Sequence, residues 1–295
     1  MVIRSHAVAK VNLTLRITDK VERGYHKLQS VFVFLDEIFD TLTVDTAREF
    51  NGSSGNIAGV KASENLIKMA ANILTSVFRK KVPHVEIKKE IPTGAGLGGG
   101  SSDAACFINV VFDLWQIPAK EKLICTKYFK ALGSDTFIFL YYYFTNLNIL
   151  FLDGAGFDGT ITPLSIQNLH YCYLVIVFDG IFLSTKKVYD NFRGPFLPRI
   201  NTNECDFELL KDFRNSLQEP AIMLVPKLQN YLRSIRATSP CFCGVSGSGS
   251  SCFGLYDTFE KAEKAMEILK SYGYCFLKMS RICPHEAKLR GFAFG

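Results

Sequence analysis

The sequence lacks the segments that direct proteins into or across membranes. Its first residues, MVIRSHAVAK, contain no apolar stretch of the kind found in a signal peptide. The longest apolar run, residues 137–152, is shorter than the ~18–20 residues that a membrane-spanning helix needs, and Asn146 and Asn148 interrupt it. We therefore expect a cytoplasmic protein that has no membrane partner.

The sequence also lacks a cysteine pattern typical of a disulfide framework or a zinc site. The nine cysteines are an odd number, and the one close pair, Cys241 and Cys243, has C-x-C rather than C-x-x-C spacing. A chain of 295 residues can form a hydrophobic core without such crosslinks. We expect buried, reduced thiols and no metal site built from protein ligands.

Charge of one sign is not concentrated anywhere in the chain. The 34 basic and 28 acidic residues give a net charge of +6, which fits an anionic small molecule as well as it fits nucleic acid. RNA-binding proteins usually display a clustered basic patch, whereas these lysines and arginines are scattered. The 48% hydrophobic content excludes a disordered chain, and the length favours two lobes, for which we expect residues 1–162 and 163–295.

The patterns that are present mix strands and helices without a regular βαβ order, which predicts an α+β fold. Residues 6–17 alternate as a half-buried strand, with Lys10 and Asn12 on the face away from the core. The other elements that we expect are strands over 31–35, 85–91, 171–178 and 251–256, helices over 64–79, about 207–235 and 258–272, and a helix after residue 100. The apolar run 137–152 predicts two buried strands joined by a turn at Thr145 and Asn146, and Asp257 with Glu260 has the spacing of a capping box.

The strongest local signal is the segment PTGAGLGGGSSDAA at residues 92–105. Five glycines between Gly94 and Gly100 let the backbone turn tightly and approach a ligand closely. An amphipathic helix follows, so that free N–H groups and the positive end of the helix dipole face the loop. This segment predicts a site for an anion, most plausibly phosphate.

Two better-known glycine motifs do not fit this loop. A Walker loop ends in Gly-Lys-Ser/Thr, whereas Gly100 is followed by Ser101. A dinucleotide-binding G-x-G-x-x-G needs a buried strand before it and an acidic residue at the end of a second strand. Here the preceding strand is charged on one face, and residues 116–122 read as polar helix or loop.

Three further features have two readings each. Lys89 lies on the apolar face of the strand at 85–91 and is either an edge lysine that reaches solvent or a functional cation. Asp135 lies in a Gly-Ser-Asp turn before an apolar strand and is either a turn cap or a functional carboxylate. The segment GVSGSGSS at 244–251 would by itself be a turn.

Taken in order, these segments resemble the GHMP small-molecule kinases. The resemblance rests on a lysine in the first strand, the glycine-rich loop, a G-x-D segment and a late S-G-S-G. The segments AKVNL at 9–13, GYHKLQSVF at 24–32 and FLD at 34–36 are similar to the branch that phosphorylates the 2-hydroxyl of 4-diphosphocytidyl-2-C-methyl-D-erythritol. The similarity runs from residue 7 to the strand after Ser251.

The resemblance implies a fold and a reaction. It implies an N-terminal lobe like ribosomal protein S5, which holds ATP, and a ferredoxin-like C-terminal lobe, with the substrate between them. The partner is then a small cytidine diphosphate compound, with no nucleic acid, and the protein a monomer or weak homodimer. Magnesium is expected with ATP, without a protein ligand that we can name.

The family pattern also implies roles for individual residues. Asp135 corresponds to the base that accepts the hydroxyl proton, and Lys10 to the lysine that orients it and stabilises the transferred charge. The residues that match the nucleotide site are Asn65, Lys89, Pro92, Thr93, Gly94, Ala95, Gly96, Leu97, Gly98, Gly99, Gly100, Ser101 and Ser102. The residues that match the substrate site are Asn12, Tyr25, His26, Phe32, Thr185 and Tyr189.

The residues assigned to the substrate site could instead have purely structural roles, and the sequence departs from the family pattern in places. Tyr25 and Phe32 are otherwise core aromatics, and His26 a turn histidine; the match at Thr185 and Tyr189 is looser. The family's Gly-Ala-Asp-Val-Pro appears here as GSDTF at 133–137, so the proline is missing. Another GHMP kinase, or a non-catalytic nucleotide- or RNA-binding protein of this fold, is the alternative, although the presence of Lys10 and Asp135 favours an enzyme.

Overall fold

The computed structural model describes residues 1–20, 26–51, 65–155, 158–164, 172–200 and 214–282, and these form two antiparallel sheets. The first sheet has the order β1-β2-β4-β5, with β3 paired to β2, and the second has the order β7-β8-β6-β9. The strands of the first sheet are β1 (Val2–Lys20), β2 (His26–Glu49), β3 (Pro83–Lys88), β4 (Ile149–Gly154) and β5 (Thr160–Pro163). The second sheet contains β6 (Cys172–Phe178), β7 (Phe242–Val245), β8 (Cys252–Tyr256) and β9 (Phe276–Ile282).

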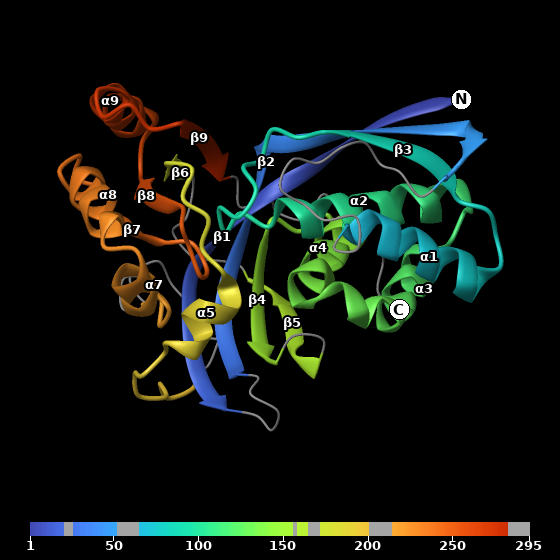
Figure 1. Ribbon diagram of the computed structural model, residues 1–295, viewed down its shortest axis with the longest axis horizontal. Coiled ribbons are helices and arrows are strands. Elements are labelled where there is room, and N and C mark those ends of the chain that lie inside the picture. The colour runs from blue at the N-terminus through green and yellow to red at the C-terminus, as the bar shows by residue number, and fades with distance from the viewer. Residues whose placement is uncertain (21–25, 52–64, 156–157, 165–171, 201–213, 283–295) are drawn as a thin grey trace.

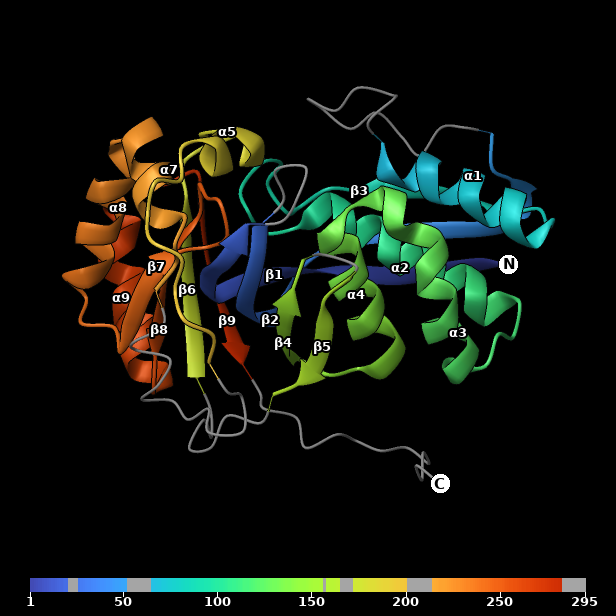
Figure 2. The same cartoon turned by 90° about the horizontal axis from the view of Figure 1, so that it is seen from below.

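Helices α1 to α4 cover the first sheet and helices α8 and α9 cover the second on the side away from the first, whereas α5 lies near the junction of the two parts, and β1 and β2 run between the two groups (Figures 1 and 2). Those of the N-terminal part are α1 (Leu66–Phe78), α2 (Gly99–Leu114), α3 (Ala119–Cys125), the 3-10 helix η3 (Thr126–Leu132) and α4 (Ser134–Thr145). Those of the C-terminal part are α5 (Thr185–Asp190), α7 (Gln218–Leu224), α8 (Lys227–Arg236) and α9 (Phe259–Lys270). The succession of strands and helices in the C-terminal part, with its 2-3-1-4 sheet order, is the ferredoxin-like arrangement predicted from the sequence.

The expectation that the first strand is half-buried is wrong. Residues 7–15 of β1 are buried on both faces, including Lys10 and Asn12. Their strand is covered on one side by the core under α2 and α4, which contains Phe34 and Phe139, and on the other by apolar side chains of the second sheet. Alternation identified the two faces correctly. The second sheet covers the apolar face, whereas the polar face is out of water because Gly96 of the glycine-rich loop and Ser246 and Gly247 of the C-terminal part contact Lys10 and Asn12.

The apolar run 137–152 is the main error of the sequence-based secondary structure. Its first half is helix α4, which begins at Ser134, and only its second half is a strand, β4. The predicted turn is present, since Asn146 caps α4 in the left-handed conformation. A helix in contact with core on most of its surface shows no amphipathic period, so aromatic and β-branched residues mimic a buried strand.

Smaller differences concern helix ends and single side chains. Asn65 is the N-cap of α1, with its side chain accepting from the amides of Ile67 and Lys68. The cap of α9 is Thr258 rather than Asp257, which is paired with Lys261. Strand β3 ends at Lys88, one residue before Lys89.

The remaining expectations concern membranes and cysteines. No helix among the described residues is long and apolar enough to cross a membrane. The cysteines in the described ranges are free thiols. Cys106, Cys172 and Cys252 are buried as expected. Cys275 is exposed, so the expectation that the thiols are buried does not hold for it.

Candidate active site

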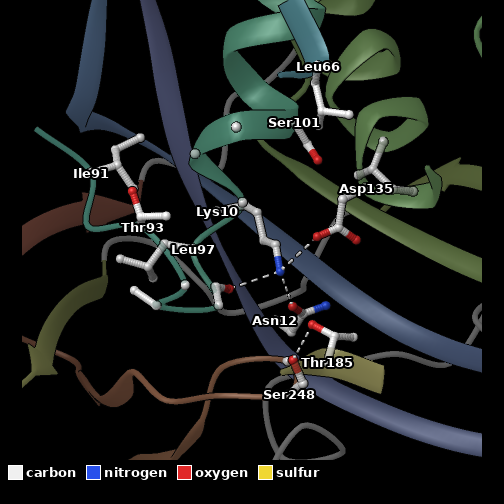
Figure 3. Close-up of a pocket in the computed structure, with 18 of the residues that line it drawn as sticks. Lys10, Asn12, Leu66, Ile91, Thr93, Leu97, Ser101, Asp135, Thr185 and Ser248 are labelled. Carbon is white, nitrogen blue, oxygen red and sulfur yellow. Dashed lines mark hydrogen bonds and ion pairs between the residues drawn. The ribbon is translucent and has the colours of Figure 1, made fainter. Parts of the chain in front are cut away.

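A cavity of about 380 Å³ lies where the two sheets meet, and both parts of the chain line it. The N-terminal part contributes β1, the glycine-rich loop before α2 and the start of α4. The C-terminal part contributes α5 and the Ser-Gly loop at residues 246–251. Figure 3 shows Lys10 near the centre of this cavity, with Asp135 on one side and Asn12, Thr185 and Ser248 on the other.

Lys10 extends from β1 into the cavity with its side chain 5% exposed. Its ammonium donates to Oδ1 of Asn12 at 2.6 Å and to the carbonyl of Gly96 at 3.1 Å, and it lies 3.5 Å from Oδ2 of Asp135. The ring of Phe32 lies 5.7 Å from the ammonium on the same face of the sheet. These partners compensate the buried charge and hold it at the inner surface of the glycine-rich loop.

Asp135 lies in the first turn of α4, where the positive end of the helix dipole favours a carboxylate. The 43% exposure of its side chain contrasts with the burial of Lys10. The helix therefore points an accessible carboxylate at the opening of the cavity, and Lys10 fixes one of its oxygens from within. This pair can take up a proton from a hydroxyl group that enters from solvent.

The glycine-rich loop has the geometry of an anion-binding turn. Gly94, Gly96 and Gly98 have φ between 72° and 77°, a conformation that other residues rarely adopt. The loop leads into the N-terminus of α2, and the first turn of a helix leaves N–H groups without intrahelical acceptors. Ser101 extends from the start of α2 toward the same cavity (Figure 3).

The Ser-Gly loop at 246–251, which the sequence reads only as a turn, packs directly on the glycine-rich loop. The amide of Ser251 donates to the carbonyl of Ala95 at 3.0 Å, and Oγ of Ser246 donates to the carbonyl of Gly96 at 3.2 Å. A Cβ on Gly96 would lie 2.7 Å from the carbonyl oxygens of Ser246 and Gly249. The C-terminal part of the chain therefore fixes the shape of the anion-binding turn.

Most of the residues predicted for the site line this one cavity. These are Lys10, Asn12, Phe32, Asn65, Lys89, Pro92, Thr93, Gly94, Ala95, Gly96, Leu97, Gly98, Gly99, Gly100, Ser101, Asp135, Thr185 and Tyr189. Ser102 and His26 do not line it. The hydroxyl of Ser102 is bonded to Tyr143 and its amide donates to the carbonyl of Gly98. Tyr25 lies outside the described residues.

His26 and Tyr189 form an aromatic pair between the two parts of the chain. The two rings are stacked with their centroids 5.4 Å apart, and the ring of Phe192 packs edge-on against His26. Burial, and secondarily the charge of Lys20, lower the pKa of His26, so that the imidazole is neutral at pH 7. Burial, and then the charge of Asp135, raise the pKa of Tyr189 and keep its phenol protonated.

Sequence reasoning missed two carboxylates at the nucleotide side of the cavity. Asp40 of β2 and Asp103 of α2 both bind the ammonium of Lys89. Asp40 is separated from the loop by about fifty residues, but a signal was present: it takes a buried position in the alternation Ile38, Asp40, Leu42 of β2. Lys89 is thus held by two carboxylates, which the family pattern did not indicate.

Comparisons with known proteins agree with this architecture. Residues 65–141 match the model of the GHMP kinases N terminal domain, and residues 202–275 match that of the GHMP kinases C terminal domain. The 4-diphosphocytidyl-2-C-methyl-D-erythritol kinase of Ruegeria pomeroyi is 32% identical over 279 residues, which cover 90% of this chain and 93% of that protein. The enzyme of the same name from Shewanella woodyi is 31% identical over 290 residues, covering 96% and 95%.

The chain belongs to the GHMP kinase family. A crystal structure of 4-(cytidine 5'-diphospho)-2C-methyl-D-erythritol kinase superposes with a TM-score of 0.74 at 29% identity, covering 96% of this chain and all of the other. Homoserine kinase from Cytophaga hutchinsonii has a TM-score of 0.69 at 14% identity, covering 96% of each chain, and shares the fold alone. The predicted two-lobed GHMP kinase fold is confirmed.

Proposed function

We propose that this GHMP kinase transfers the γ-phosphoryl group of ATP to the 2-hydroxyl of 4-diphosphocytidyl-2-C-methyl-D-erythritol, a step of the non-mevalonate isoprenoid pathway. The relatives support this substrate, because proteins named for the phosphorylation of this compound align with at least nine-tenths of the chain. One structural observation carries the proposal: Lys10 and Asp135 lie 3.5 Å apart in the cavity that the glycine-rich loop lines. An anion site and an acceptor-activating pair therefore share one space.

In this mechanism Asp135 accepts the proton of the substrate hydroxyl as the oxygen attacks the γ-phosphorus in line. Lys10 orients the carboxylate and stabilises the negative charge of the transferred group. Phosphoryl transfer depends mainly on placement and on charge stabilisation, which a buried ammonium with fixed partners supplies. The leaving group is ADP, and the proton leaves on Asp135.

The nucleotide occupies the side of the cavity formed by the glycine-rich loop, with its phosphates at the N-terminus of α2. The donor is MgATP, and the magnesium enters on the phosphates. Among the described residues no cluster of His, Cys, Asp and Glu side chains could hold a metal ion by itself. Asn65 and residues 92–101 are the nucleotide-binding residues that we propose, with the hydroxyl of Ser101 at the phosphates.

The cytidine end of the substrate lies near His26 and Tyr189. Aromatic faces stack on a nucleobase, and a neutral imidazole can donate or accept at the edge of a cytosine. Asn12 and Thr185 are polar residues that line the cavity, and in this proposal they bind the sugar of the substrate. We further propose residues 1–162 and 163–295 as the two domains; a monomeric or weakly dimeric state and a cytoplasmic location stay predictions.

The decisive experiment compares the wild-type protein with Asp135→Asn. The wild type, given MgATP and the diphosphocytidyl substrate, should produce a new phosphomonoester signal in ³¹P NMR, and mevalonate, homoserine and galactose should produce none. Asp135→Asn should lose this activity but bind MgADP with nearly unchanged affinity in calorimetry. Full turnover of the variant would exclude Asp135 as the base, and preferred turnover of another alcohol would assign the protein to a different GHMP kinase.

A further inference from the structure

A buried cluster of three charged residues lies beside the nucleotide side of the cavity. It consists of Lys89, Asp40 and Asp103, with the ammonium in contact with Asp40 and 2.7 Å from Oδ2 of Asp103. The side chains of Asp40 and Asp103 are 0% and 3% exposed, and that of Lys89 is 21% exposed. Both acceptors of Lys89 are thus fixed inside the protein, and its charge is neutralised before any ligand arrives.

Asp40 also fixes the backbone that leads into the glycine-rich loop. Its Oδ1 accepts from the amide of Glu90 at 2.5 Å and from the amide of Ile91 at 2.8 Å, while Oδ2 accepts from Lys89. One carboxylate of β2 therefore holds three consecutive residues, the last of which immediately precedes Pro92. A carboxylate that accepts several backbone amides in this way is a rigid anchor.

Asp103 connects the same lysine to α2. Lys89 lies against the first residue of this helix, since a Cβ on Gly99 would be 3.2 Å from its Nζ and 3.1 Å from Ile91. Strand β2, the approach to the loop and the start of α2 are therefore joined through one ammonium. The loop is held at both of its ends by this cluster.

The cluster carries one more negative than positive charge when both carboxylates are ionised. Burial raises the pKa of Asp103 to about 7, and the ammonium of Lys89 opposes the rise. Within the described residues, Oδ1 of Asp103 has no hydrogen-bond partner. Without Lys89 the two buried carboxyl groups would face each other with no cation between them, so the segments they belong to would lose the ammonium that joins them and an uncompensated buried carboxylate would remain.

We propose that Asp40, Lys89 and Asp103 position the nucleotide loop, and that Lys89 acts through the loop rather than as a ligand of the nucleotide. The inference rests on the proposed function in taking a nucleotide as the ligand of this cavity. It differs from the family-based expectation for Lys89, in which the lysine itself contacts ATP. The two roles make opposite predictions for variants of the carboxylates.

The test measures MgADP affinity by calorimetry, and the KM of each substrate, for Asp40→Asn, Asp103→Asn, Lys89→Met and the double variant Lys89→Met, Asp103→Asn. A positioning role predicts that each single variant weakens MgADP binding about tenfold, with the KM of the cytidyl substrate unchanged. The double variant should bind better than Lys89→Met alone, because it removes one of the two buried carboxyl groups that Lys89 no longer compensates. Lys122→Met is the matched control: this lysine is also buried and paired, with Asp113 of α2, but lies outside the cavity.

The outcomes separate the two roles. Direct contact with the nucleotide predicts that Asp40→Asn and Asp103→Asn bind MgADP as well as the wild type or better, and that the double variant gains nothing; either result overturns the inference. Equal loss in Lys122→Met would also overturn it, by showing a general effect of losing a buried lysine. A wild-type protein that does not bind MgADP would overturn the proposed function itself, which distinguishes that failure from this one.

Discussion

At the scale of single residues, Lys10 is the group most constrained by its surroundings. Its ammonium has the oxygens of Asn12, Gly96 and Asp135 around it and almost no contact with solvent. A donor fixed in this way contributes to catalysis because no reorganisation is needed when charge develops. The same contacts fix one oxygen of Asp135, so the two residues act as a unit.

Replacement of Lys10 by Met should lower kcat by roughly 10²–10³, the usual cost of losing one fixed charge-stabilising donor. Steady-state kinetics with saturating MgATP measure this, and a thermal melt establishes that the variant is folded. The KM of the cytidyl substrate should change little, because the lysine acts on the transferred phosphoryl group. A variant with the kcat of the wild type would show that Lys10 has no part in the chemical step.

Tyr189 lines the cavity and stacks its ring on that of His26. Tyr189→Ala should raise the KM of the cytidyl substrate by about 5- to 150-fold, which corresponds to the ~1–3 kcal/mol of one aromatic stack, and leave the KM of ATP nearly unchanged. Tyr128→Ala is the control, since Tyr128 is an exposed tyrosine of η3 outside the cavity. Equal changes in both KM values would contradict the placement of the cytidine.

The sequence predicted residues of this kind well where a motif names them and poorly where only the fold brings them in. Lys10 and Asp135 lie 125 positions apart and were paired by family resemblance, whereas their 3.5 Å separation follows only from the packing of α4 against β1. Asp40 belongs to no motif, and its role depends on the amides of Glu90 and Ile91. Its one trace in the sequence is a charge at a buried position of the alternation.

At the scale of elements, α4 shows why a correct residue can be placed on the wrong structure. Residues 137–144 are apolar or aromatic throughout and predict a strand on composition. They form a helix because Gly133, Ser134 and Asp135 begin one, and because the core surrounds most of its faces. The error matters for function, because the helix dipole stabilises a carboxylate in the first turn of a helix. A carboxylate that precedes a strand receives no such stabilisation.

The glycine-rich loop permits an element-scale prediction at Gly96. Gly96→Ala puts a Cβ 2.7 Å from two carbonyl oxygens of the 246–251 loop at φ of 77°, so the strain should lower stability by about 1–3 kcal/mol and raise the KM of ATP. Gly100→Ala is the control for stability alone, because a Cβ there meets nothing within 4 Å and the residue is helical, although it also lines the cavity. It should stabilise the protein slightly, by about 0.5–1 kcal/mol.

Denaturant unfolding and ATP titration of the two glycine variants are the measurements. A Gly96→Ala protein with unchanged stability and unchanged KM would show that the two loops separate freely. The contact between these loops would then have no part in shaping the anion site.

At the scale of the whole molecule, the cavity exists only because the two parts of the chain meet at one loop. The sequence predicted both lobes and their order, and the comparisons confirm that fold. It did not predict that β1 is buried on both faces or that the Ser-Gly loop of the second lobe contacts Ala95 and Gly96. Such contacts depend on how the lobes pack, and alternation and motif spacing report only on local structure.

The global stability should carry the signature of the buried carboxylate of Asp103. Because burial raises its pKa to about 7, the folded state holds this proton more tightly than the unfolded state does, despite the opposing ammonium of Lys89. The stabilisation is therefore complete below the ordinary pKa near 4 and is lost as the pH rises through 7, at a slope of at most about 1.4 kcal/mol per pH unit.

The free energy of unfolding of Asp103→Asn minus that of the wild type should rise between pH 4 and 7 and then level off. A flat difference for Asp103→Asn would mean that this carboxylate is ionised throughout, with Lys89 outweighing its burial.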